Sequence, residues 1–219
     1  MSILVATKII DSLSVMMLIS SFFVVVNRRL SHIVPIISFQ ALLLSLISAT
    51  VAYATGIEDI YVVALLTLLI KSLLVPIVLL YVLKKIVVLD KVEAVCTVKV
   101  TILSCLLLVI VAFYVTGPIL KTAKVLTQNS LPVSISLILI GLFIMITRKK
   151  ALMQVIGLIT MENGLYLTAI STTYGMPLIV ELGIFFDLLV GVIIMGILSY
   201  RINQAFDSIN TDKLQKLKG

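Results

Sequence analysis

Residues 102–115 read ILSCLLLVIVAFYV and residues 131–145 read LPVSISLILIGLFIM, two stretches in which nearly every position is apolar. A membrane β-strand alternates apolar and polar residues at every second position, and these stretches do not. Similar apolar blocks of about 18 to 25 residues recur along the chain, which is the length that an α-helix needs to cross a bilayer. The sequence therefore predicts an all-α, polytopic transmembrane helical bundle.

The composition agrees with a fold that is solvated by lipid. Hydrophobic residues make up 61% of the 219 residues and charged residues 12%, whereas about a quarter of a soluble domain is charged. We expect about seven helices, at residues 9–26, 33–55, 61–83, 100–120, 131–147, 151–170 and 176–200. The first block is expected to be a retained helix rather than a cleaved signal peptide, because the basic pair Arg28-Arg29 follows the apolar run.

No soluble domain fits between the predicted helices, so residues 1–219 are expected to form one membrane domain. We divide it into an N-terminal four-helix part at residues 1–128, a three-helix part at residues 129–201 and a cytoplasmic tail at residues 202–219. The two cysteines are nine residues apart near the fourth helix, which is too far for a disulfide along one helix, about 13 Å. With a single histidine in the chain, we expect no metal or cofactor in this subunit.

The basic residues sit at the ends of the predicted helices and form no single stripe, which argues against nucleic-acid binding despite the net charge of +7. With seven spans, thirteen of the seventeen Lys and Arg residues fall on one side and three on the other. The positive-inside rule then places the N-terminus outside and the C-terminus in the cytoplasm of an inner membrane protein. The thirteen are Arg28, Arg29, Lys84, Lys85, Lys91, Lys99, Arg148, Lys149, Lys150, Arg201, Lys213, Lys216 and Lys218. His32, beside the first pair, is interpreted as an ordinary interfacial histidine.

Ionisable residues inside the spans are the candidate functional groups, because a charge in the bilayer is costly and normally faces the bundle interior. Lys71, Glu162 and Asp187 each lie about 15 to 17 Å from the start of their predicted helix, close to the middle of the membrane. Three such groups at one depth suit a proton relay, with Lys71 as a tuning or relay partner of the carboxylates. Glu181 is shallower. It is also assigned to the relay, and the alternative for it is an interfacial position within reach of lipid headgroups.

A fixed ion pair is the alternative for these residues. Lys71 would then bind Glu162 or Asp187 and only hold helices together, and the sequence leaves the choice of carboxylate open. The uncharged Gln40, Gln154 and Asn163 are expected to link helices by hydrogen bonds rather than to act in transport.

Pro76 lies inside the third predicted helix. Because proline lacks an N–H group, it should free a backbone carbonyl about one turn earlier, near Ser72, and a kink is expected there.

The run from Ile140 to Leu158 reads IGLFIMITRKKALMQVIGL and continues to Glu162-Asn163. A basic turn, a Gly-Leu pair and a membrane glutamate in this order resemble the small K subunit of complex I. The segment FDLLVG at residues 186–191 looks like the third helix of that family. The family's first glutamate would fall at Ile159, so Glu162 lies about 4.5 Å further along the helix on nearly the same face.

The complete layout, with four helices before the K-like part, resembles component E of hydrogenase-4 and formate hydrogenlyase-type complexes. The resemblance implies a non-catalytic membrane subunit of an ion-translocating redox complex, packed between antiporter-like and quinone-site-type subunits. It also implies that iron–sulfur clusters and a nickel–iron centre belong to partner subunits. The alternatives are a small subunit of a multisubunit cation/proton antiporter, a purely structural assembly subunit and an independent solute carrier.

Overall fold

The computed structural model describes residues 3–85, 97–122, 127, 129–173, 185, 189, 191–193 and 196. In these ranges the chain is helical, and the predicted all-α polytopic bundle is confirmed. The helices are α1 (Ile3–Val26), α2 (Leu30–Thr55), α3 (Glu58–Leu66), the π-helix η1 (Thr67–Leu74), α4 (Val75–Lys85), α5 (Val98–Thr122), α6 (Ser130–Thr147) and α7 (Ala151–Thr173).

Within the described ranges, five segments are long and apolar enough to cross a membrane. They are Val5–Val26, Leu30–Thr55, Glu58–Tyr81, Val98–Pro118 and Ser130–Thr147. The third includes η1, because α3, η1 and α4 follow one another without a break. Helix α7 matches the sixth predicted helix and is 23 residues long, but it is not among the five, and it carries the polar Glu162 and Asn163. Most of the seventh predicted helix lies outside the described residues.

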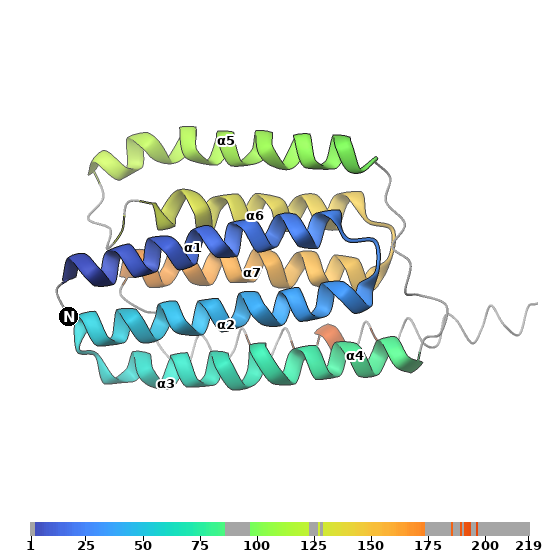
Figure 1. The fold of residues 1–219 in the computed structure, drawn as a ribbon, viewed down its shortest axis with the longest axis horizontal. Coiled ribbons are helices and arrows are strands. Elements are labelled where there is room, and N and C mark those ends of the chain that lie inside the picture. The colour runs from blue at the N-terminus through green and yellow to red at the C-terminus, as the bar shows by residue number, and fades with distance from the viewer. Residues whose placement is uncertain are drawn as a thin grey trace, which may run out of the picture.

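The helices run side by side along the long axis of the molecule (Figure 1). Helices α6 and α7 form the most closely packed pair. Helix α1 contacts both α2 and α6, and α2 contacts α7 as well as α3, η1 and α4, whereas α5 lies on the outside against α6 and α1. The first two helices therefore pack directly on the α6–α7 hairpin and form one bundle with it.

Glycine residues determine how closely α6 and α7 approach each other. A Cβ atom added to Gly141 on α6 would lie 2.6 Å from the backbone oxygen of Gly157 and 2.6 Å from the backbone nitrogen of Met161, both on α7. A Cβ atom at Gly164, seven residues beyond Gly157, would lie 2.7 Å from the carbonyl oxygen of Ser134 on α6. Such close backbone contact needs small residues at the crossing, as in other membrane helix pairs. The two helices thus form a rigid hairpin.

The two ends of the bundle differ in their charged residues. The α1–α2 and α6–α7 connections lie at the same end (Figure 1), with Arg28 and Arg29 in the first and Lys149 in the second, all three exposed. Arg148 of the second connection is buried and donates a hydrogen bond from Nη2 to the carbonyl oxygen of Val25, at 2.5 Å. We call this the basic end.

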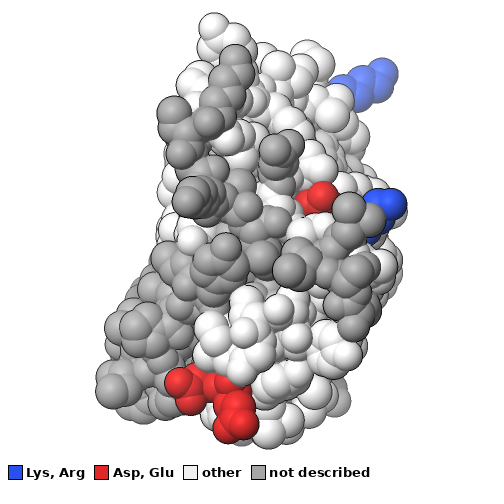
Figure 2. Space-filling model, turned by 90° about the vertical axis from the view of Figure 1, so that its left-hand side faces the viewer, with Lys and Arg blue, Asp and Glu red and all other residues white. Residues whose placement is uncertain are grey.

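The opposite end, where α3 begins, carries the exposed Glu58 and Asp59. Figure 2 looks onto that end and shows acidic side chains gathered at its lower edge and basic side chains at its right-hand edge. We call it the acidic end.

Buried apolar residues form two clusters, one toward each end of the bundle. The basic-end cluster includes Val24, Leu30, Ile144, Met153 and Ile159, and the acidic-end cluster includes Ile10, Val51, Ile60, Val133 and Tyr166. On α7, Ile159 belongs to the first cluster and Tyr166 to the second, so residues 162 and 163 lie between the two. The polar residues of the bundle's middle are therefore flanked by apolar layers on both sides.

Candidate functional site

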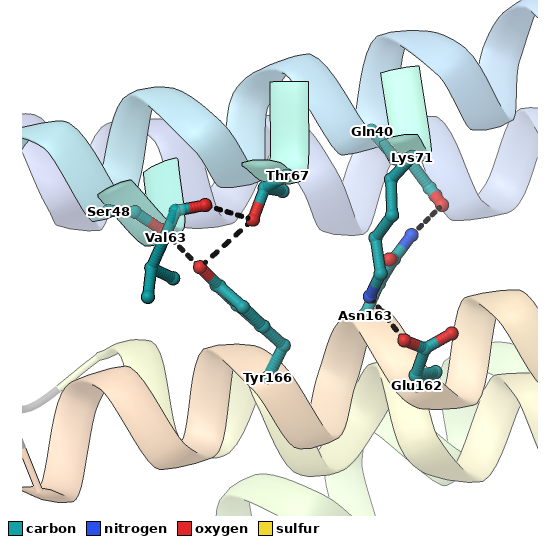
Figure 3. Close-up of polar contacts among 8 residues, drawn as sticks. All are labelled: Gln40, Ser48, Val63, Thr67, Lys71, Glu162, Asn163 and Tyr166. Atoms are coloured by element: carbon teal, nitrogen blue, oxygen red, sulfur yellow. Dashed lines mark hydrogen bonds and ion pairs between the residues drawn. The ribbon is translucent and has the colours of Figure 1, made fainter. Parts of the chain in front are cut away.

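The site is an ion pair at the middle of two helices. The Nζ atom of Lys71 lies 2.5 Å from Oε1 of Glu162, and the two side chains are 2% and 7% exposed. Glu162 is the middle residue of α7, and Lys71 is within one residue of the middle of the helical segment 58–85. Figure 3 shows the two side chains reaching toward each other from η1 and α7. The pair is thus about 16 Å from either end of α7, as far from both membrane surfaces as a helix of this length allows.

Lys71 stands on a wide helical turn. In η1 the backbone bonds span five residues, as from the N–H of Val75 to the carbonyl of Ile70. Pro76 follows directly and has no N–H to offer the carbonyl of Ser72. The hydroxyl of Ser38 on α2 donates to that carbonyl instead, at 2.5 Å. The Ser72 carbonyl, which was expected to lack its helical donor, accepts this hydrogen bond from α2. The expected kink stays a prediction, and the backbone before Pro76 is the π-helix η1.

Several polar atoms beside the pair have no hydrogen-bond partner among the described residues. Apart from the Lys71–Glu162 contact itself, these are Nζ of Lys71, both carboxylate oxygens of Glu162 and Oδ1 of Asn163. The amide of Asn163 donates to Oε1 of Gln40 at 3.4 Å, and Gln40 in turn donates to the carbonyl of Met17 at 3.5 Å. The predicted linking role of Gln40 and Asn163 is confirmed, since they connect α1, α2 and α7. A buried ionic pair without further hydrogen bonds is held less firmly than one whose remaining valences are satisfied.

Two aromatic rings face the Lys71 ammonium group. Its Nζ atom is 4.7 Å from the ring centre of Phe185 and 5.3 Å from that of Tyr166. Both distances are within the range in which a ring attracts a cation, and the attraction is strongest away from water. The rings therefore stabilise a charged Lys71 independently of Glu162.

A cluster of hydroxyl groups lies one turn from the ion pair, toward the acidic end (Figure 3). The phenol oxygen of Tyr166 is 2.7 Å from Oγ of Ser48 and 3.2 Å from Oγ1 of Thr67. Ser48 and Thr67 also bond to the carbonyls of Leu44 and Val63 in their own helices. The cluster fastens α7 to α2 and η1 beside the pair.

The structure decides one question that the sequence left open. Of the four predicted relay residues, the described part of the chain contains Lys71 and Glu162, and these two form an ion pair. Asp187 and Glu181 lie outside the described residues. Ile159, where the K-subunit pattern has its first glutamate, is buried in the basic-end cluster at 2% exposure.

The residues around the pair were not among the predicted site residues. Tyr166 and Thr67 lie one helical turn from Glu162 and Lys71 respectively, and this spacing of four residues was the available signal. Nothing in the sequence indicated Phe185. In the described parts of the chain no three His, Cys, Asp or Glu side chains are placed to hold a metal ion.

The carboxyl-terminal part of the chain matches a known family. Residues 130–219 match the model of NADH-ubiquinone/plastoquinone oxidoreductase chain 4L, the family of the small K subunit. Helices α6 and α7, with Glu162, lie in this range.

Similarity to individual proteins extends further. Hydrogenase-4 component E of Escherichia coli (strain K12) is 25% identical over 213 residues, which cover 97% of this chain and 99% of that protein. The chain is similar to hydrogenase-4 component E over almost its full length. The hydrogenase-4 component E of Shigella flexneri gives the same identity and coverage.

An uncharacterised protein of Mycobacterium tuberculosis is 39% identical over 111 residues, about half of this chain and half of that protein. No solved structure matches the chain significantly. The chain 4L and hydrogenase-4 component E similarities agree with the resemblance derived from the basic turn and Glu162. Together with the apolar helices they support an integral membrane subunit related to complex I.

Proposed function

We propose that this chain is a membrane subunit of an ion-translocating hydrogenase complex related to complex I, and that Lys71 and Glu162 are members of its mid-membrane proton relay. The observation that carries the relay is the buried Lys71–Glu162 pair, placed midway along two helices. The similarity to hydrogenase-4 component E supports the kind of complex, because it includes the helices that precede the chain 4L match.

The geometry allows the pair to open and close, as a relay requires. A proton that reaches Glu162 neutralises the carboxylate and removes the attraction for Lys71. The ammonium group keeps attractive contacts when the carboxylate is neutral, because the rings of Tyr166 and Phe185 already face it. Loss of the proton from Glu162 restores the pair. The state of the pair can therefore change as charge arrives from a neighbouring group.

Asp187 and Glu181 belong to the proposal on sequence grounds alone, as the second carboxylate and its shallower neighbour. The partners are antiporter-like and quinone-site-type membrane subunits, with the iron–sulfur clusters and nickel–iron centre in further subunits. The chain itself supplies membrane-embedded side chains and no catalysis of its own.

A structural assembly subunit is the second candidate, and the short Lys71–Glu162 distance favours it as well. In that case the pair holds η1 against α7, and the Ser48–Thr67–Tyr166 cluster reinforces the contact. When the carboxylate is neutralised and the complex still assembles, a relay subunit loses proton pumping, whereas a structural subunit keeps it.

The decisive experiment is redox-driven proton pumping by the reconstituted native complex. We expect Glu162→Gln to leave electron transfer within about twofold of wild type and to reduce pumping at least tenfold, because the variant keeps the side chain's size but cannot take up a proton. Asp187→Asn should behave similarly. Gln154→Leu, on the same helix two turns from Glu162, is the matched control and should pump normally.

Equal pumping by Glu162→Gln, Asp187→Asn and wild type would establish the structural role instead. Mass spectrometry of the same preparation identifies the parent complex. Nickel–iron and iron–sulfur subunits support the proposal, a complex of antiporter-like subunits alone places the chain in a cation antiporter, and no partner at all favours a carrier.

We further propose that the basic end faces the cytoplasm. The exposed Arg28, Arg29 and Lys149 lie at that end and the exposed Glu58 and Asp59 at the other, as expected from the positive-inside rule. In a chain with Cys96→Ser and Cys105→Ala, a cysteine at Lys149 should react with a membrane-impermeant maleimide only in inverted vesicles. A cysteine at Asp59 should react only in intact, outer-membrane-permeabilised cells. The reverse pattern would contradict the proposed orientation.

A further inference from the structure

An open groove of about 440 Å³ lies between α1 and α2, outside the site described above. Its lining is apolar apart from Ser20, and runs from Met16 to Phe23 on α1 and from Pro35 to Phe39 on α2. Along α1 this is about 10 Å. Phe23 and Phe39 are 58% and 43% exposed, so the groove opens toward the surroundings of the bundle.

The groove ends beside the basic α1–α2 connection. Phe23 lies within the last turn of α1, and the exposed Arg28 and Arg29 follow it. His32, also exposed, is in the first turn of α2. No described acidic residue pairs with either arginine, and Glu58 and Asp59 are at the opposite end of the bundle.

We propose that this groove and connection bind one anionic phospholipid, with an acyl chain between α1 and α2 and the headgroup phosphate against Arg28 and Arg29. An apolar groove at membrane depth favours a hydrocarbon chain, and two guanidinium groups that have no acidic partner among the described residues favour a negative headgroup beside it. A purely apolar partner helix would fill the groove but would offer no negative charge to the two arginines. The positive charge of Arg28 and Arg29 therefore favours an anionic lipid over an apolar helix as the occupant of the groove.

The test measures lipid binding to the full chain purified in mild detergent. Native mass spectrometry with added phosphatidylglycerol or phosphatidylethanolamine gives the affinity for each lipid. We expect tighter binding of phosphatidylglycerol, by roughly 30-fold, since each basic side chain at a membrane surface contributes about fivefold. Arg28→Gln/Arg29→Gln should abolish this preference. Lys99→Gln/Lys149→Gln removes equal charge at exposed positions away from the groove and should keep the preference within twofold.

A second variant tests the groove independently of the charges. Ile36→Trp fills the groove and should weaken both lipids at least tenfold, and an unchanged thermal unfolding midpoint shows that the variant is folded. Equal binding of the two lipids by wild type, or an unchanged preference in the double arginine variant, would overturn the proposal. So would a photoreactive residue at Phe39 that, in the native complex, crosslinks to a protein subunit rather than to lipid.

Discussion

Replacing Lys71 by Met alone is expected to destabilise the bundle by about 3–5 kcal/mol, whereas Lys71→Met together with Glu162→Leu should unfold close to the wild-type temperature. The single change leaves a carboxylate that is 7% exposed without its cation, and breaking one partner of a buried pair costs about this much. Replacing both partners by apolar residues of similar size is often neutral or stabilising. The expected result is thus a large coupling free energy of unfolding between Lys71 and Glu162, which lie in different helices.

The buried thiol of Cys105 provides the measurement. Cys105 is 0% exposed in the folded chain, so in a Cys96→Ser background a thiol-reactive dye reports unfolding in detergent. Lys99→Met, which removes an exposed charge, is the control and should change stability by less than about 0.5 kcal/mol. If the double variant were as unstable as Lys71→Met, the coupling would be refuted. The double variant also separates the two candidate functions, because an assembled complex that carries it and pumps normally cannot use the pair as a relay.

Gly141→Ala is expected to destabilise the α6–α7 hairpin by about 2–3 kcal/mol, although alanine is the better helix former. The added methyl would lie 2.6 Å from backbone atoms of Gly157 and Met161, and neither backbone can move without separating the helices. In an open helical position the same change stabilises by about 0.5–1 kcal/mol.

Gly191→Ala is the matched control, because a Cβ atom there meets no described atom within 4 Å. The Cys105 unfolding assay compares both variants, and the two changes should have opposite signs. Two variants of equal stability would show that α6 and α7 can separate slightly at no cost, contrary to the close contact at Gly141.

The positions of the described helices could be predicted from the sequence, but the contacts between helices could not. Apolar length located the described spans, and depth along the helix located Lys71 and Glu162. Depth alone did not choose between Glu162 and Asp187 as partner of Lys71, because it contains no information about which helices touch. Which helices touch depends on their packing. One example is Gly141 and Gly164, where the absence of a side chain allows α6 and α7 to meet.

Other features of the site could not be predicted because they also depend on which helices touch. Ser48, Thr67 and Tyr166 are ordinary residues in apolar helices, and only the packing of α2, η1 and α7 brings their hydroxyl groups together. Pro76 predicted a free carbonyl at Ser72, but not that the turn before it would widen into a π-helix. Arg148 was grouped with the basic residues on one side of the membrane, and the sequence did not indicate that it is buried against the end of α1.

The two partners of the ion pair differ in their mechanical support. Glu162 belongs to a helix whose backbone packs closely on α6 at Gly157 and Gly164, on either side of it. Lys71 has a long, flexible side chain on a π-helical turn that is anchored to α2 through Ser38. In the proposed relay, opening of the pair would therefore be asymmetric. The backbone of Glu162 would stay in place, and the Lys71 side chain would make the larger movement.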